Sequence, residues 1–216
     1  MLKALLFDLD GTLADTDSVH LLAWAKVLEP HGYEVTQDFY QDRISGRSDP
    51  QIVSELLPNL SPKASRSVVE ARDADFRERI EALEPLSGLL HLITKGREKG
   101  MEISLVTNAS RENVLAVLRV LGLNSAFDPV ILADDVGAGK PDPAPYWAAL
   151  EALGISADEA VAFEDSPTGI ASSVDAGIPT VGIASTHEPE KLEGLGLDLI
   201  VRDFTDPKLE TFVEGR

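Results

Sequence analysis

The segment Phe7-Asp8-Leu9-Asp10-Gly11-Thr12 decides the fold, because it closes the first apolar run of the chain, Leu2 to Phe7, with two acidic side chains. A short apolar run that stops at a polar turn is typical of a buried β-strand. Gly11 allows the backbone to turn sharply after that strand. The segment therefore predicts a buried strand whose carboxyl end carries Asp8 and Asp10.

Four further apolar runs predict strands of the same kind: Glu102 to Thr107, Pro129 to Ala133, Ala160 to Phe163 and Ile178 to Ile183. Their apolarity is nearly continuous rather than alternating, which is typical of parallel strands covered on both faces. Amphipathic segments lie between the runs, for example the segment from Pro145 to Leu153. Strands that alternate with helices predict an α/β fold with a doubly wound parallel-sheet core.

The region from residue 15 to residue 84 interrupts this alternation. It contains no convincing strand but several helical stretches, among them Ser18 to Leu28 and Ser61 to Leu83. Ser48-Asp49-Pro50 resembles a helix N-cap followed by a proline in the first turn. We therefore expect an inserted α-helical cap domain at residues 15–84 and a catalytic core made of residues 1–14 and 85–216.

The composition is that of a globular chain, with 44% hydrophobic and 26% charged residues, and it excludes a disordered or collagen-like protein. The absence of cysteine excludes disulfides, zinc–thiolate sites and cysteine nucleophiles. The net charge of −18 gives an acidic surface that repels nucleic acid and anionic lipid. Neither a targeting signal nor an apolar stretch of membrane-spanning length is visible. We expect a cytoplasmic monomer with no nucleic-acid or membrane partner.

Asp8 and Asp10 lie where ligands bind in open α/β sheets, outside the carboxyl ends of the strands. Being two residues apart at a strand end, they can point to the same side. Two carboxylates that share a site repel one another unless one is protonated or a cation neutralises them. A hard divalent ion with oxygen ligands, most simply Mg²⁺, meets this requirement. The plain alternative is an acidic corner that only faces water.

Polar side chains also follow three of the other predicted strands. Thr107 and Asn108 end the second strand, Lys140 lies in the loop after the third, and Glu164 and Asp165 form an acidic pair after the fourth. A hydroxyl, an amide and an ammonium group can hold phosphate oxygens, and a second acidic pair can share a cation. Each feature alone is weak, but together they predict one site at the carboxyl edge of the sheet.

On these residues the sequence resembles the haloacid dehalogenase-like hydrolase superfamily. The four signatures of that superfamily appear in order as Asp8-Leu9-Asp10-Gly11-Thr12, Thr107, Lys140 and Glu164-Asp165. The likeness spans nearly the whole chain and implies a Rossmann-like core, with the helical insertion as the cap. Two stretches are especially similar to the sugar-phosphatase and β-phosphoglucomutase-like branch: Val106-Thr107-Asn108-Ala109 and Phe163-Glu164-Asp165-Ser166-Pro167-Thr168-Gly169-Ile170.

The resemblance implies an enzyme that hydrolyses small phosphate monoesters, with phosphorylated sugars as the expected substrates. Asp8 would be the nucleophile that forms an aspartyl-phosphate, and Asp10 would be the general acid and base. Thr107, Asn108 and Lys140 would hold the non-bridging phosphate oxygens.

The resemblance also implies a ligand set for Mg²⁺. The carboxylates of Asp8 and Asp165 and the backbone carbonyl of Asp10 would bind the ion, and Glu164 would contribute directly or through water. Such an ion lets an anionic nucleophile approach an anionic phosphoryl group.

Three alternatives remain at this stage. A β-phosphoglucomutase-like enzyme would share every core residue, but mutases carry an arginine soon after the Gly-x-Ser of the cap loop, where this chain has Asp49 after Gly46-Arg47-Ser48. Dehalogenases of the superfamily generally lack the second aspartate, so Asp10 argues against that activity. In a non-enzymatic phospho-receiver the acidic pair precedes the phosphate acceptor, the reverse of the order here.

Two cap residues are candidates for contact with the substrate. Arg47 lies in a Gly-Arg-Ser loop, from which a guanidinium could meet an anionic or hydroxyl-rich part of the substrate. His20 and Trp24 look like the first cap helix of the same branch. His20 could equally be a packed histidine, and Trp24 is expected in the core of the cap. The cap lysine of mutases is missing, and Arg72 is the nearest basic residue.

Overall fold

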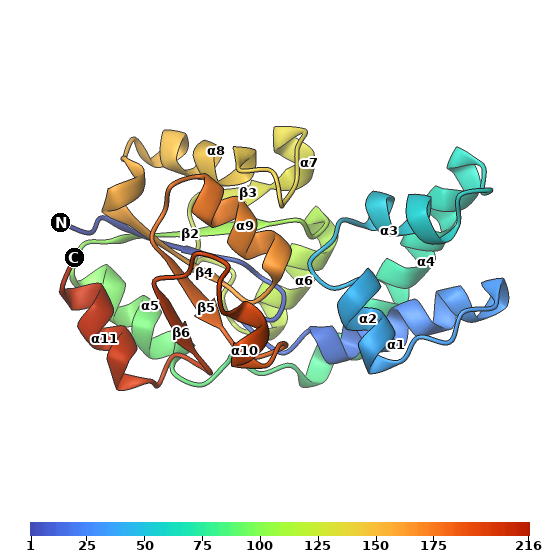
Figure 1. Cartoon of the computed structure of the whole chain (residues 1–216), viewed down its shortest axis with the longest axis horizontal. Coiled ribbons are helices and arrows are strands. Elements are labelled where there is room, and N and C mark those ends of the chain that lie inside the picture. The colour runs from blue at the N-terminus through green and yellow to red at the C-terminus, as the bar shows by residue number, and fades with distance from the viewer.

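A computed structural model describes residues 1–216 and contains one sheet of six parallel strands in the order β3-β2-β1-β4-β5-β6 (Figure 1). The strands are β1 (Ala4–Phe7), β2 (Glu102–Thr107), β3 (Val130–Leu132), β4 (Ala160–Glu164), β5 (Thr180–Ile183) and β6 (Leu199–Val201). The predicted α/β class and the doubly wound parallel sheet are confirmed. The central strand β1 pairs with β2 on one side and β4 on the other, with Phe7 opposite both Leu105 and Phe163.

The two faces of β1 explain its continuous apolarity. Leu5 and Phe7 belong to a large apolar cluster on one face, whereas Ala4 and Leu6 belong to a second cluster on the other. The first face is covered by α5 (Leu89–Glu98), α6 (Arg111–Val120) and α11 (Pro207–Glu214), and the second by α8 (Ala144–Leu153) and α9 (Pro167–Asp175) (Figure 1). Because both faces are buried, neither requires polar residues. Short helices α7 (Ala133–Val136), α10 (Pro189–Leu192) and η3 (Ala157–Glu159) complete the core.

Four helices of the insertion form a group at one end of the molecule, away from both chain termini (Figure 1). They are α1 (Asp17–Leu28), α2 (Gln37–Arg43), α3 (Asp49–Leu56) and α4 (Pro62–Arg79), with the short helices η1 (Glu29–His31) and η2 (Ile80–Ala82). A separate apolar cluster that includes the buried Trp24 holds this group together. An independent core supports the proposed cap domain, whose boundaries at 15 and 84 stay a prediction.

The structure differs from the predicted elements mainly at the edges of the sheet. The sixth strand β6 was not predicted, because it has only three residues and follows a segment with two glycines, Gly194 and Gly196. The predicted strands starting at Pro129 and Ile178 begin later, at Val130 and Thr180. Ser48 does cap α3, and a reciprocal bond with Gln51 completes a capping box. No helix of the structure is both long and apolar enough to cross a bilayer.

Candidate active site

The order of the strands places the site. In a sheet of the order 3-2-1-4-5-6, the connections run in opposite directions from the first strand, and ligands bind at that switch point. Asp8 follows β1, Glu164 ends the neighbouring β4, and Asp165 follows that strand. One potential ligand atom from each of these three buried residues lies within 4.8 Å of the others. Asp8, from the first predicted acidic pair, therefore meets both members of the second pair.

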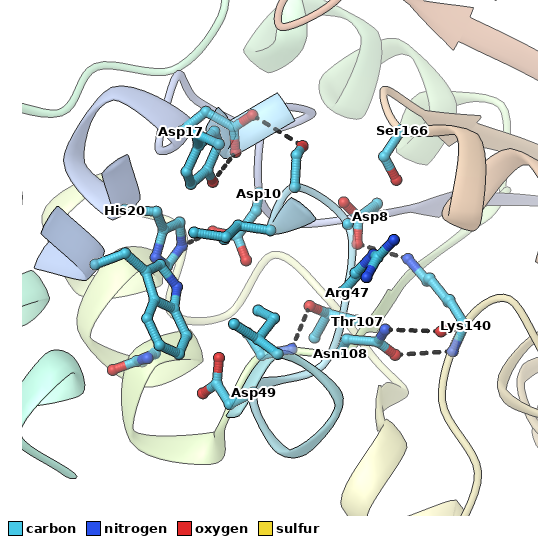
Figure 2. A pocket seen from close by; sticks show the side chains of 18 of the residues that line it. Asp8, Asp10, Asp17, His20, Arg47, Asp49, Thr107, Asn108, Lys140 and Ser166 are labelled. Atoms are coloured by element: carbon cyan, nitrogen blue, oxygen red, sulfur yellow. Dashed lines mark hydrogen bonds and ion pairs between the residues drawn. The ribbon is translucent and has the colours of Figure 1, made fainter. Parts of the chain in front are cut away.

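Lys140 reaches into this acidic cluster from the loop after α7. Its Nζ donates to Asp8 Oδ1 at 2.6 Å and to the carbonyl oxygen of Val106 at 2.7 Å, and it lies 2.7 Å from Glu164 Oε1. Burial lowers the pKa of Lys140, but the adjacent carboxylates of Asp8 and Glu164 outweigh that effect and raise the pKa above its ordinary value. The lysine is therefore a permanent cation beside Asp8 (Figure 2).

A single lysine does not balance three buried carboxylates. Burial raises the pKa of Asp8 to about 8; Lys140 lowers it, whereas Glu164 and Asp10 raise it. Burial likewise raises the pKa of Asp165, together with the charges of Asp17 and Asp8. Glu164 Oε2 is buried and has no hydrogen-bond partner. An all-oxygen donor set with surplus negative charge and an orphaned oxygen fits a hard divalent cation.

Two glycines allow the backbone to approach these carboxylates. A Cβ on Gly11, whose φ is +68°, would lie 2.1 Å from Asp165 Oδ2. A Cβ on Gly169, in the first turn of α9, would lie 1.9 Å from Glu164 Oε2. No side chain fits at either distance, so the site requires glycine at both positions.

Asp10 is in the same pocket but points away from the acidic cluster. Its Oδ1 accepts a hydrogen bond from Thr16 Oγ1 at 2.8 Å. The same oxygen lies 3.0 Å from His20 Nε2 (Figure 2). Arg72 Nη1 lies 3.3 Å from His20 Nδ1. Because a guanidinium can only donate, Nδ1 accepts this bond and Nε2 is left to donate to Asp10.

These contacts determine the ionisation of Asp10. Burial alone raises the pKa of Asp10, but the hydrogen bonds from His20 and Thr16 and the nearby Arg72 guanidinium outweigh it, so the pKa is lowered. The His20 ring is itself fixed by stacking on Phe76, with ring centroids 4.0 Å apart. In this arrangement Asp10 is a carboxylate.

The predicted phosphate-binding residues lie at the other side of Asp8. Both Thr107 and Asn108 line the pocket with Lys140. The Thr107 hydroxyl accepts a bond from the amide of Ala109 at 3.0 Å. The Asn108 side chain makes two hydrogen bonds with the backbone of Lys140. Its Oδ1 accepts from the Lys140 N–H at 2.9 Å, and its Nδ2 donates to the Lys140 carbonyl oxygen at 3.2 Å. Asn108 therefore positions the lysine loop, and direct contact of Asn108 with phosphate stays a prediction.

The cap residues occupy less expected positions. Arg47 lines the pocket but forms an ion pair with Glu55 on α3. Arg72 is buried and forms ion pairs with Asp49, which also lines the pocket, and with Asp73. Its guanidinium carbon lies 5.1 Å from the centre of the Trp24 ring. His20 thus contacts Asp10, whereas Arg47 is held at the rim.

Sequence reasoning missed three polar partners of the site. Thr16 bonds to Asp10, Thr186 Oγ1 donates to Asp165 Oδ2 at 2.6 Å, and the Tyr146 hydroxyl donates to Glu164 Oε1 at 2.5 Å. Thr16 lies six residues after Asp10 and could have been suspected from the sharp turn between them. Nothing in the sequence near Tyr146 or Thr186 indicates a contact with the site, and only the packing of α8 and of the loop after β5 places them here.

A doubly wound sheet with buried carboxylates and a lysine at its switch point defines the class of α/β enzymes whose active site is built around an aspartate after the first strand. Residues 5–183 match the family model described as haloacid dehalogenase-like hydrolase, so the chain belongs to this family. The predicted family resemblance is confirmed, and the protein is a hydrolase-family enzyme.

Three curated relatives cover nearly the same length. The chain is 31% identical to validoxylamine A 7'-phosphate phosphatase of Streptomyces hygroscopicus subsp. limoneus, over 95% of this chain and 96% of that protein. It is 31% identical to a phosphorylated carbohydrates phosphatase of Thermotoga maritima, over 83% and 84%. It is 28% identical to β-phosphoglucomutase of Bacillus subtilis, over 99% and 95%.

A solved structure supports the same fold. CbbY from Rhodobacter sphaeroides, determined in complex with phosphate, superposes with a TM-score of 0.84 at 25% identity, covering 95% of this chain and 96% of that one. The helical group at residues 17–82 is therefore part of an architecture shared with that protein.

Proposed function

We propose that the protein is a Mg²⁺-dependent phosphatase that hydrolyses small phosphate monoesters, chiefly of sugars, through an aspartyl-phosphate on Asp8. The observation that carries this proposal is the contact of 2.6 Å between the buried Asp8 carboxylate and Lys140, with Asp10 in the same pocket. A carboxylate next to a cation can attack phosphorus, and a second carboxyl group can serve the leaving oxygen.

In the first step, an oxygen of Asp8 attacks the phosphorus atom in line with the leaving alcohol. The new bond joins the Asp8 carboxylate to phosphorus, and the bond between phosphorus and the sugar oxygen breaks. Lys140, with Thr107 and Asn108, holds the non-bridging oxygens, on which the charge is spread in the transition state. Positioning and electrostatics by these residues supply most of the catalysis.

Asp10 moves the protons. In its protonated form it donates to the departing alcohol, and as the carboxylate it then takes a proton from the water that hydrolyses the aspartyl-phosphate. The bonds from Thr16 and His20 hold Asp10 ready for the second role, because they favour its ionised form.

The carboxylates of Asp8 and Asp165, the backbone carbonyl of Asp10 and the free oxygen of Glu164 are the groups that would hold Mg²⁺. When bound, the ion neutralises the charge of the cluster and acts as a Lewis acid toward the phosphoryl oxygens. The raised pKa of Asp8 and the orphaned Glu164 Oε2 support this assignment.

The relatives support a sugar phosphate as the substrate, since two of the three carry phosphorylated carbohydrates or phosphoglucose in their names. The relatives also leave a mutase activity, in which the phosphoryl group moves from one hydroxyl of the sugar to another, as the competing function. We favour hydrolysis because residue 49, in the cap loop, is an acid that is already bound to Arg72. A mutase would need a cation free to hold the phosphate that stays on the sugar.

The experiment is a panel of phosphoesters that includes sugar phosphates, phosphoglycolate and β-glucose 1-phosphate, assayed with Mg²⁺ and with excess EDTA. Release of inorganic phosphate that EDTA abolishes is the expected result. Conversion of β-glucose 1-phosphate to glucose 6-phosphate without phosphate release would identify the mutase. Undiminished turnover in EDTA would contradict the role of the metal.

A further inference from the structure

The cap side of the pocket holds the cation Arg72, whose charge is countered by two acids of this chain. The Arg72 guanidinium pairs with Asp49 through Nη2 and lies 3.0 Å from Asp73 Oδ1 through Nη1, which also contacts His20. Its Nε is buried and has no partner. Arg72 therefore offers no accessible donor to a ligand, although it lines the pocket.

The other cap arginine does not replace it. Arg47 is tied to Glu55 at the rim of the pocket, and only a third of its side chain is exposed. Both cap arginines are thus paired with acids of the cap.

Asp49 lines the end of the pocket that lies away from Asp8. Its Oδ2 binds Arg72, its Oδ1 makes no hydrogen bond, and its side chain keeps 20% of its surface exposed. Figure 2 shows Asp49 on the side of the pocket away from Asp8 and Lys140. Asp10 and Asp17 also line this pocket. A leaving group at this end meets acceptors and negative charge, and finds no unpaired cation.

We propose that Asp49 is a specificity-determining residue, which selects phosphomonoesters whose leaving group is a neutral polyol or carries an amine, and which disfavours a leaving group that bears a second anionic group. A hydroxyl or an ammonium group can donate to Asp49 Oδ1. A second phosphate or a carboxylate would be placed against a like charge, which is unfavourable. This inference rests on the proposed phosphatase activity and names the substrate class.

The test compares three ligands of one scaffold: glucose 6-phosphate, glucosamine 6-phosphate and glucose 1,6-bisphosphate. kcat/KM is measured for each with the Mg²⁺-loaded protein, and slow substrates are measured as competitors of para-nitrophenyl phosphate. We expect the amine and neutral compounds to exceed the bisphosphate by about tenfold or more, as like-charge contacts predict. In Asp49→Asn this ratio should fall severalfold, whereas Asp49→Glu should keep it.

Glu70→Gln is the matched control, since it removes one negative charge from an exposed position of the same cap helix as Arg72. It should leave all three values and their ratio unchanged. If Asp49 only supported the structure, Asp49→Asn would lower kcat for all three ligands equally, and this result would overturn the inference. A preference of the wild-type protein for the bisphosphate, or no competition by any of the three, would also overturn it. Loss of all turnover, para-nitrophenyl phosphate included, would instead contradict the proposed function.

Discussion

At the scale of single residues, the site is a balance between burial and charge. Asp8, Glu164 and Asp165 are almost completely buried, and Lys140 supplies the one cation in contact with two of them. A buried carboxylate without a full countercharge holds its proton more tightly than in water. The unfavourable electrostatic energy of the buried carboxylates is therefore relieved when a cation binds, which increases the affinity of the site for the cation.

Replacement of the nucleophile tests the mechanism most directly. Asp8→Asn keeps the size of the side chain but removes its nucleophilic oxygen, so we expect kcat to fall by at least about 10⁴-fold and the phosphoenzyme to disappear. The measurement is a single-turnover reaction with a radiolabelled phosphoester, stopped with acid, in which the phosphate bound to the protein is counted. Asp15→Asn, at an exposed position of the same loop, is the control and should behave as wild type.

The raised pKa values predict how stability changes with pH in the absence of metal. Asp8, with a pKa of about 8, and Asp17, with a pKa of about 6, bind protons in the folded state that they lose in the unfolded state above their ordinary pKa of 3.8. The folded protein then binds more protons than the unfolded one, so stability falls as pH rises from about 4 to about 8.

The expected result is a melting temperature in EDTA that drops by several degrees between pH 5.5 and pH 8, since each kcal/mol shifts Tm by roughly 2–4 °C in a chain of this size. Mg²⁺ should restore Tm most strongly at the higher pH, because binding requires the deprotonated carboxylates. Asp8→Asn should flatten the slope in EDTA. A Tm that rises steadily over this range would contradict the electrostatic account of the site.

Asp10 can be tested through the leaving group. Asp10→Asn removes the general acid, which contributes typically about 10²–10⁴-fold, and this loss should fall on sugar phosphates, whose alkoxide is a strong base. Para-nitrophenolate departs without help, so single-turnover phosphorylation by para-nitrophenyl phosphate should be far less affected. Mg²⁺ affinity, titrated in parallel, should stay similar because the proposed ligand is the backbone carbonyl. Equal losses with both substrates would show that Asp10 is not the acid.

The residues of this site were predictable to different degrees. Asp8, Asp10, Lys140, Glu164 and Asp165 could be found because each follows a recognisable apolar strand or its loop. The contacts of Asp49 and Arg72 could not, since their meeting depends on how α3 packs against α4.

At the scale of elements, hydrogen bonds and apolar contacts join the cap to the core. Thr168 Oγ1, in the first turn of α9, donates to the carbonyl oxygen of Gly46 in the cap loop at 2.7 Å. Gln41 Nε2 of α2 donates to the carbonyl oxygen of Thr186 at 2.9 Å. Asn113 of α6 donates to Asp73 of α4 at 2.6 Å. Apolar contacts add to these bonds, because Ala23 of α1 and Phe76 of α4 belong to the large apolar cluster of the core.

Thr168→Val removes the first of these bonds with little change in shape. A neutral hydrogen bond contributes about 0.5–1.5 kcal/mol. Without it, the arrangement in which the cap loop contacts α9 should be less populated, and KM should rise about two- to tenfold. Steady-state kinetics with a sugar phosphate measures this effect. Thr94→Val, which removes a bond within the exposed turn of α5, should leave KM unchanged. An unchanged KM in Thr168→Val would mean that this contact does not hold the cap.

The elements themselves were largely predictable, because hydrophobic periodicity is a local property. Five of the six strands follow from apolar runs, and Ser48 marks the start of α3. The strand β6 could not be predicted, since three residues at the edge of a sheet owe their conformation to pairing with β5 rather than to their own pattern. The order of the strands is likewise a property of the whole sheet.

At the scale of the whole molecule, surface charge and exposed apolar groups predict the oligomeric state. A net charge of −18 makes copies of the chain repel one another. The large exposed hydrophobic side chains besides Met1 are Leu22, Leu90, Leu115 and Trp147, each on a different helix. We expect light scattering after size exclusion to give the monomer mass of 23.2 kDa. A stable dimer at micromolar concentration in 150 mM salt would contradict this prediction.

The bond between Asp10 and His20 joins two parts of the molecule, since Asp10 follows β1 of the core and His20 belongs to α1. Any motion of α1 that parts the two side chains raises the affinity of Asp10 for a proton, because the contact that favours its ionised form is lost. Thermodynamic linkage is reciprocal. A proton taken up by Asp10 must therefore favour the parted arrangement by the same free energy, and the acid–base cycle and the movement of the cap become a single coupled equilibrium.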